Sequence, residues 1–253
     1  MCTVVTLRRP GADWPLILGA NRDEMVERPW DPPGRHWPDR PDVLAGRDRL
    51  AGGSWLGTND TGVVVGVLNR HGTLGPAAGF RSRGELVLEA LDHADAADAA
   101  RALRQLDPKA YRPFNMVVAD NRDAFWLRHA DPTGTLAIAV TPIPAGLSML
   151  TAGDLDDAES SRIRRYRPLF AAAPPPDPDR NDFRAWEALL GDRSFAPEDG
   201  PNAAMRFLTP SGFGTVSSAL IALRKPGGNR PAARFRFARW SPKEEPWQEV
   251  SGR

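Results

Sequence analysis

The residue best placed to do chemistry in this chain is Cys2, its only cysteine. Removal of Met1 would leave Cys2 with both a thiol and a free α-amino group. The amine titrates near ~7.7–8.0 and the thiol near ~8.5, so each can exchange a proton with the other around neutral pH. An N-terminal nucleophile activated by its own amine is an established catalytic arrangement. The alternative is that Cys2 packs as a small apolar residue at the start of a strand.

A polar tetrapeptide, Asn21 to Glu24, is the second feature that could take part in chemistry. It follows an apolar run at 16–20, and another β-rich run occupies 3–7. A Pro-Gly step between the two runs marks a turn, so the runs are predicted to pair as a hairpin. That hairpin would return the tetrapeptide to the neighbourhood of Cys2.

The other elements are predicted from hydrophobic periodicity and turn residues. Strands are expected at 52–57, 63–68, 114–120, 124–129, near 135–141, 146–151, 214–223 and 234–240, and helices at 85–91, 94–106, 160–170 and 183–190. Residues 28–50 have no sustained period and are predicted to form an irregular covering loop. Strands at both ends with helices between them favour two stacked sheets covered by helices, in one domain over residues 1–253.

Composition excludes several classes of protein. A net charge of +1, with arginines interleaved among acids, argues against a nucleic-acid binder. One cysteine and four scattered histidines give neither a disulfide framework nor the spacing of a zinc site. No run approaches the ~20 apolar residues needed to span a bilayer, and no signal peptide opens the chain. The expectation is a cytoplasmic protein whose partner is a small-molecule substrate or ligand, with no metal site and no required cofactor.

An ordered series of short motifs covers nearly the whole chain. The series is Met1-Cys2, Asn21-Arg22-Asp23-Glu24, Gly53-Ser54-Trp55-Leu56-Gly57, Asn69, Arg83-Gly84-Glu85-Leu86, Phe114-Asn115 and Phe213-Gly214-Thr215. It resembles the NRDE family, also called the transport and Golgi organisation protein 2 family. That family is similar to the N-terminal nucleophile hydrolases. The resemblance implies an α+β fold, a four-layer αββα sandwich of two stacked antiparallel sheets.

The resemblance also implies roles for individual residues. Similar enzymes with an N-terminal cysteine, the bile salt hydrolases and penicillin V acylases, cleave carbon–nitrogen amide bonds. By that resemblance Cys2 attacks the carbonyl and Asp23 orients the new α-amine. Arg22 would hold the thiolate or a substrate carboxylate, and Asn69 would donate to the oxyanion.

Two positions depart from the pattern of similar proteins. Ala152 stands where the hydrolases place an asparagine, and Val216 stands where related members have an arginine after Gly-Thr. An oxyanion-hole donor can be worth ~3–4 kcal/mol of barrier. Turnover would therefore require other groups, such as Asp154, Ser217 or backbone amides, to reshape the site.

Four residues are candidates for substrate binding: Asn21, Trp55, His71 and Arg81. The alternatives without a functional role are that Trp55 fills the core and that His71 and Arg81 are solvated. A non-catalytic protein on the same fold is the second hypothesis, since the resemblance also implies haem trafficking or the handling of acyl-CoA and lipid. The candidate haem ligands are His36, His71, His93, His129 and Cys2.

Overall fold

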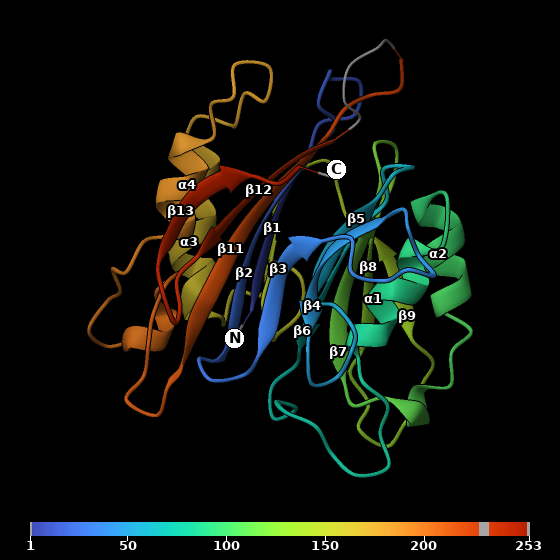
Figure 1. Cartoon of the computed structure of the whole chain (residues 1–253). Helices are drawn as coiled ribbons and strands as arrows, with labels where there is room; N and C mark the ends of the chain where they lie inside the picture. Colours follow the sequence, from blue (N-terminus) through green and yellow to red (C-terminus); the bar gives the residue numbers. More distant parts are fainter. Residues whose placement is uncertain (1, 228–232, 252–253) are drawn as a thin grey trace. The chain divides into compact units, whose positions relative to one another are not determined.

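The computed structural model of the chain describes residues 2–227 and 233–251 (Figure 1). The described residues group into two compact units, each built around one antiparallel sheet. The first unit combines residues within 1–28, 145–225 and 233–250, and the second consists mainly of 29–144. One domain over residues 1–253 stays a prediction.

The first unit holds a six-stranded sheet in the order β10-β1-β2-β11-β12-β13. Its strands are β1 (Thr3–Arg8), β2 (Leu16–Met25), β10 (Gly146–Leu150), β11 (Phe213–Leu223), β12 (Ala233–Arg239) and β13 (Glu245–Glu249). The predicted N-terminal hairpin is confirmed: Thr3 pairs with Asn21, and Arg8 pairs with Leu16. β2 runs through the polar tetrapeptide to Met25, so those residues lie inside the strand.

Helices α3 (Ser161–Ala172) and α4 (Arg184–Leu190) cover one face of this sheet (Figure 1). Their apolar side chains pack on the alternate strand residues that point to the same face. Val5, Ile17 and Leu220 are buried there against Ile163, Phe170 and Trp186. Burial of alternate strand positions against a helix is the usual way in which a sheet face is removed from water.

The second unit holds a seven-stranded sheet in the order β3-β4-β5-β6-β7-β8-β9. Its strands are β3 (Trp30–Gly34), β4 (Val43–Asp48), β5 (Leu56–Asn59), β6 (Val64–Asn69), β7 (Phe114–Ala119), β8 (Ala124–His129) and β9 (Ala139–Pro142). Helices α1 (Gly84–Leu91) and α2 (Ala96–Leu103) pack on one face of this sheet. The short 3-10 helices are η1 (Pro108–Ala110) and, in the first unit, η2 (Pro201–Ala203).

The prediction of an irregular loop over 28–50 is wrong, because β3 and β4 lie within it. β3 contains two consecutive prolines, and β13, which was not predicted, contains one. Both strands lie at the edge of their sheet. A proline is tolerated there because its missing N–H faces no partner strand. Because prolines are more typical of loops than of strands, these two edge strands were not predicted from the sequence.

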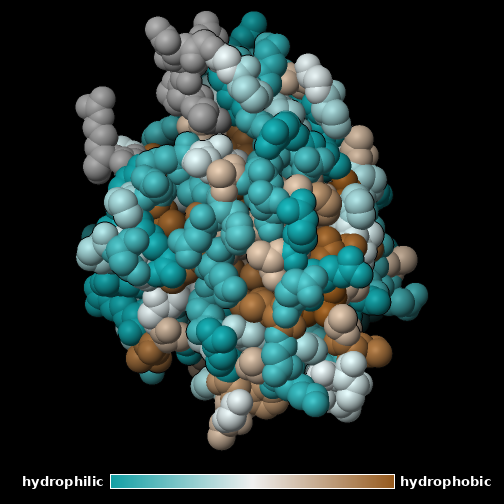
Figure 2. Space-filling model, turned by 90° about the vertical axis from the view of Figure 1, so that its right-hand side faces the viewer, coloured by the Kyte–Doolittle hydropathy of each residue, from teal (hydrophilic) through white to brown (hydrophobic). Residues whose placement is uncertain are grey.

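Exposed apolar side chains are dispersed over the chain. Leu50, Leu74, Leu136 and Leu208 are each at least half exposed, and they come from separate loops. Figure 2 shows one face, on which hydrophilic residues predominate and hydrophobic ones form smaller areas between them. Within the described part of the chain, no helix is both long enough and apolar enough to cross a membrane.

Candidate functional site

Cys2 lies immediately before β1, beside the middle of the polar tetrapeptide. The Asp23 backbone N–H donates to the Cys2 sulfur at 3.4 Å, and the thiol donates to the Asp23 carbonyl at 3.6 Å. The pairing of Thr3 with Asn21 puts Cys2 opposite Arg22 and explains this contact. The predicted approach of the tetrapeptide to Cys2 is therefore confirmed.

The surroundings of Cys2 keep its thiol protonated. Burial raises the thiol pKa above its ordinary value, and the nearby Asp23 charge raises it further. The charge of the terminal amine, the backbone hydrogen bond from Asp23 and the Arg22 charge lower the thiol pKa but do not reverse the shift. A thiol with a raised pKa is a weak nucleophile at neutral pH until a base takes its proton.

The Asp23 carboxylate is fully buried and bound on both oxygens. The Thr215 hydroxyl donates to Oδ1 at 2.7 Å, and Arg162 Nη1 donates to Oδ2 at 3.0 Å. The side chains of Asp23 and Arg162 are 0% and 1% exposed. A buried carboxylate needs such partners, because an unpaired charge away from water is costly.

A β-bulge in β11 lets the hydroxyls of Thr215 and Ser218 reach two side chains on the same face of β2, those of Asp23 and Asn21. Thr215 pairs with Asp23 and Ser217 pairs with Arg22, so Val216 is the extra residue between them. Without a bulge, residues an odd number apart on a strand point to opposite faces. With it, both Thr215 and Ser218 bond side chains of β2 that face the helices.

The side chain of Asn21 links three parts of the first unit. Its Nδ2 donates to the carbonyls of Leu190 and Met205 at 2.9 and 2.8 Å. Its Oδ1 accepts from the Ser218 hydroxyl at 2.5 Å. Asn21 is 2% exposed, and in this structure its amide holds the end of α4 and residue 205 against the sheet.

Arg22 is also buried, at 5% exposure, but its neighbours differ from those of Asn21 and Asp23. Its guanidinium lies 3.8 Å from the Glu24 carboxylate, which in turn lies 3.6 Å from Arg28. Alternation along β2 directs Arg22 to the face opposite Asn21 and Asp23. The tetrapeptide thus serves both faces of the strand.

Arg162 and Thr215 were not among the predicted site residues. Arg162 belongs to a helix with four arginines, and such a sequence is typical of a basic face exposed to solvent. The signal that could have identified it is its spacing: Arg162, Tyr166 and Phe170 are four residues apart and share the buried face. Thr215 carried no comparable signal, because the bulge that directs it is not visible in the sequence.

The other four predicted site residues belong to the second unit. Asn69 ends β6 opposite Phe114, and His71 is exposed in the loop that follows. Trp55 packs edge-on against Trp30, with ring centroids 5.6 Å apart. Arg81 forms an ion pair with Glu85 at 2.5 Å and lies over the Tyr111 ring. Their roles in oxyanion or substrate binding stay predictions.

The histidines proposed as haem ligands have dissimilar surroundings. His129 is buried, and its Nε2 lies 3.1 Å from the Tyr111 carbonyl. His36 Nε2 lies 2.8 Å from the Pro32 carbonyl, and His93 accepts from Asn59 through its own carbonyl. Across residues 2–227 and 233–251, no group of three or more His, Cys, Asp or Glu side chains could hold a metal ion. Haem binding stays a prediction.

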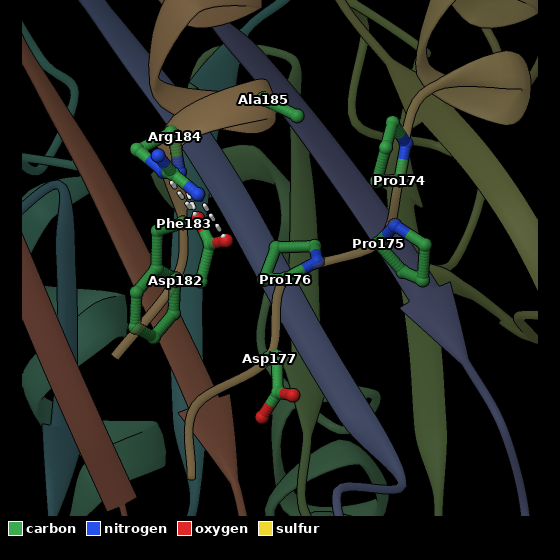
Figure 3. A pocket seen from close by; sticks show the side chains of 8 residues that line it. All are labelled: Pro174, Pro175, Pro176, Asp177, Asp182, Phe183, Arg184 and Ala185. Atoms are coloured by element: carbon green, nitrogen blue, oxygen red, sulfur yellow. Dashed lines mark hydrogen bonds and ion pairs between the residues drawn. The ribbon is translucent and has the colours of Figure 1, made fainter. Parts of the chain in front are cut away.

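A surface cavity of about 270 Å³ lies in the first unit, along the proline-rich segment between α3 and α4. Figure 3 shows Pro174, Pro175 and Pro176 on one side, with the Arg184 side chain directed to Asp182 on the other. None of the predicted site residues lines this cavity. One wall of the cavity is a turn closed by backbone hydrogen bonds between Asp177 and Asp182.

Comparison with solved structures shows the fold. The chain is similar to the Caenorhabditis elegans ortholog of N-acylethanolamine-hydrolyzing acid amidase, with a TM-score of 0.56, 15% identity, and coverage of 91% of this chain and 95% of that one. Two variants of a conjugated bile acid hydrolase from Clostridium perfringens are similar at TM-scores of 0.53 and 0.56 and at 12% and 11% identity. They cover 100% and 98% of this chain, which covers 97% and 92% of theirs. The predicted fold class, that of the N-terminal nucleophile hydrolases, is confirmed.

Comparison with sequences shows the family. None of the curated proteins compared with this chain matches it. The model of the Transport and Golgi organisation 2 family matches residues 1–187, which is well over half of the 253 residues. The ordered motifs that suggested this family begin at Cys2 and include the tetrapeptide of the site. The chain therefore belongs to the Transport and Golgi organisation 2 family.

Proposed function

We propose that this chain is a cysteine amidohydrolase that cleaves the carbon–nitrogen bond of a small acylated amide. The observation that carries the proposal is the contact of the Cys2 sulfur with the backbone of Asp23, whose carboxylate is buried and held on both oxygens. The fold is shared with structures of an acid amidase that hydrolyses N-acylethanolamines and of a conjugated bile acid hydrolase. That likeness supports the reaction class and leaves the substrate open.

The proposed reaction starts from the chain without Met1, in which Cys2 carries the α-amine. The amine takes the thiol proton, and the sulfur attacks the amide carbonyl to give a tetrahedral oxyanion. Collapse of this intermediate breaks the carbon–nitrogen bond, and the leaving amine departs with the proton. Water, deprotonated by the same α-amine, then hydrolyses the thioester and restores the thiol.

The raised thiol pKa is consistent with this sequence of steps. A protonated thiol must lose its proton as it attacks, and an adjacent amine with a pKa of ~7.7–8.0 can accept it near neutral pH. The proposed part of the Asp23 carboxylate is to orient that amine. Arg22, on the other face of β2, is proposed to hold the thiolate or an acidic group of the substrate.

Intact-protein mass spectrometry tests the proposal. The purified chain is measured before and after incubation with a panel of N-acyl amides, and separately with iodoacetamide. The expected result is loss of Met1, an acyl adduct with at least one amide, and alkylation at a single site. Because Cys2 is the only cysteine, any thiol adduct reports on it alone.

Two matched variants sharpen the test. Cys2→Ser should lose both the acyl adduct and the alkylation. Asp23→Asn should keep alkylation while the acyl adduct forms at least tenfold more slowly. Retention of Met1 together with an unreactive Cys2 would contradict the hydrolase proposal. It would favour the other function suggested by the resemblance, a protein that binds haem or acyl-CoA on the same fold.

A further inference from the structure

Arg162 is a charged side chain that the fold places in the interior next to the site. It is the first arginine of α3 and is 1% exposed, whereas Arg164 and Arg167 on the same helix are 56% and 45% exposed in their side chains. Burial of a guanidinium is costly unless it is paired and hydrogen-bonded. Its position therefore requires specific partners.

Those partners come from both strands of the N-terminal hairpin. Nη1 of Arg162 donates to the Thr3 hydroxyl at 2.8 Å and to the Asp23 carboxylate at 3.0 Å. Thr3 is covalently next to Cys2, and the Asp23 backbone contacts the Cys2 sulfur. One nitrogen of Arg162 is thus bonded to the residue that follows the nucleophile and to the residue that flanks it on β2.

The remainder of the guanidinium is fixed from a third direction. Nη2 donates to the Asn202 carbonyl at 2.7 Å, and the group lies over the Phe207 ring, 5.4 Å from its centroid. Contacts to two strands, a backbone carbonyl and an aromatic ring leave the planar group little freedom to turn. A lysine could supply the charge but not this set of directions.

We propose that Arg162 is a positioning residue for Cys2: it holds Thr3 and the Asp23 carboxylate in register around the nucleophile and balances the Asp23 charge. The proposal rests on the proposed function in one respect, that Cys2 is the nucleophile. The guanidinium that reaches the Asp23 carboxylate comes from α3.

The effect of Arg162 on the thiol depends on the other charged groups around Cys2 and around the ion pair of Asp23 with Arg162. The charged side chains around Cys2 are Asp23, Arg22 and Arg162, with Glu24 paired to Arg22, and the terminal amine adds a positive charge. From β11, the Asp23 carboxylate meets the neutral hydroxyl of Thr215. Removal of the Arg162 charge makes the surroundings of the thiol more negative, which disfavours the thiolate.

A double-mutant cycle read by alkylation of Cys2 tests the proposal. The rate of reaction with iodoacetamide is measured from pH 6 to pH 11 by intact mass in four proteins: wild type, Arg162→Met, Asp23→Asn and the double variant. We expect the midpoint of the rate profile to rise by about one pH unit in Arg162→Met and to fall in Asp23→Asn. The double variant, with both charges removed, should return near the wild-type midpoint.

Two further variants separate positioning from folding. Arg164→Met, on the exposed side of the same helix, should leave the midpoint unchanged. Arg162→Lys keeps the charge, so its midpoint should stay near wild type even if Arg162→Met fails to fold by circular dichroism. It should still slow acylation by the best amide at least tenfold, because lysine cannot reproduce the bonds to both Thr3 and Asn202.

The outcomes are decisive in both directions. A midpoint that is unchanged in folded Arg162→Met, or that rises in Arg162→Lys, would overturn the proposal. Alkylation needs no turnover, so a chain that hydrolyses no amide but shows the predicted cycle would contradict the proposed function while supporting this charge coupling. A chain that hydrolyses amides equally well in wild type and Arg162→Lys would contradict the positioning role alone.

Discussion

The sulfur of Cys2 is held by the backbone of Asp23, while the side chain of Asp23 is held by Arg162 and Thr215. The backbone of Asp23 therefore contacts the sulfur, while its carboxylate sets the charge near the thiol. A substitution of the Asp23 side chain changes the charge near the thiol and keeps the backbone N–H that contacts the sulfur. This separation makes the electrostatic part of the site accessible to mutation.

The raised thiol pKa predicts how stability depends on pH. Because the folded-state pKa lies above the unfolded value of ~8.5, the thiol contributes stability fully below that value. The contribution is lost as pH rises from ~8.5 through the folded pKa. Urea unfolding of wild type and Cys2→Ser at pH 7.5 and pH 9.5 measures it. The midpoint of the wild type should fall more than that of the variant, and equal falls would show that the thiol is not shifted.

Asn21 should be important for stability independently of any catalytic role. Asn21→Ala leaves the carbonyls of Leu190 and Met205 and the Ser218 hydroxyl without this partner. Each buried polar group deprived of its bond costs about 1–3 kcal/mol, so we expect a loss of about 3 kcal/mol in the free energy of unfolding. Denaturant titration gives the value.

The matched control is the asparagine of the chain's second Asn-Arg-Asp sequence. Asn121 lies in the turn between β7 and β8 and is half-buried. Asn121→Ala should cost less than about 1 kcal/mol. Similar losses in the two variants would mean that the buried amide of Asn21 is not what stabilises the first unit.

Two adjacent glycines make a second matched pair. A Cβ at Gly53 would lie 2.4 Å from the Gly84 carbonyl carbon and 2.8 Å from the Glu85 nitrogen, whereas a Cβ at Gly52 would meet nothing within 4 Å. Gly53→Ala must therefore displace the start of α1, at a cost of about 2–3 kcal/mol. Gly52 has a φ of +75°, so Gly52→Ala pays only backbone strain of about 1 kcal/mol. Thermal unfolding of both variants compares them, and the reverse order would show that the close approach is not tight.

Asp31 should support β3 only above acid pH. The guanidinium of Arg49, with that of Arg47, holds the pKa of Asp31 below its ordinary value, although burial opposes them. The contribution is present above the unfolded pKa of ~3.9 and is lost as pH falls through the lower folded value. Since both arginines are more than a third exposed, we expect less than about 1 kcal/mol. Urea midpoints at pH 7 and pH 3 should converge for wild type and Asp31→Asn at the lower pH.

Much of the fold could be predicted from the sequence because the central strands carry uninterrupted apolar runs. The hairpin of β1 and β2 and the buried β6 follow such patterns. The edge strands β3 and β13 could not be predicted, because their prolines and polar residues are typical of loops. Arg234 and Arg236 of β12 form ion pairs with Glu249 of β13, so the missed strand also supplies partners for these charges.

The site could be predicted only as far as short-range pairing determines it. Cys2 and Asp23 are 21 residues apart and are joined by one hairpin, which a turn signal reveals. Arg162 and Thr215 are 139 and 192 residues from Asp23, and they reach it from a helix packed on the sheet and from a strand with a bulge. Helical spacing places Arg162 on the buried face of α3, but neither the partner that it meets there nor the bulge beside Thr215 has a local signature. The partners of the carboxylate therefore depend on the assembled tertiary structure.

That separation also sets an order of events during synthesis. The N-terminal strand leaves the ribosome first, but Thr215 is made only in the last fifth of the chain, and β2 cannot pair with β11 before then. Contacts so distant in sequence close late, because the entropy of a long loop must be overcome first. At ~5–20 residues per second, this leaves a delay of roughly ten seconds or more between emergence of β2 and of β11. An enzyme that trims nascent chains therefore meets the N-terminal segment before β11 has joined the sheet and before Thr215 has reached the Asp23 carboxylate.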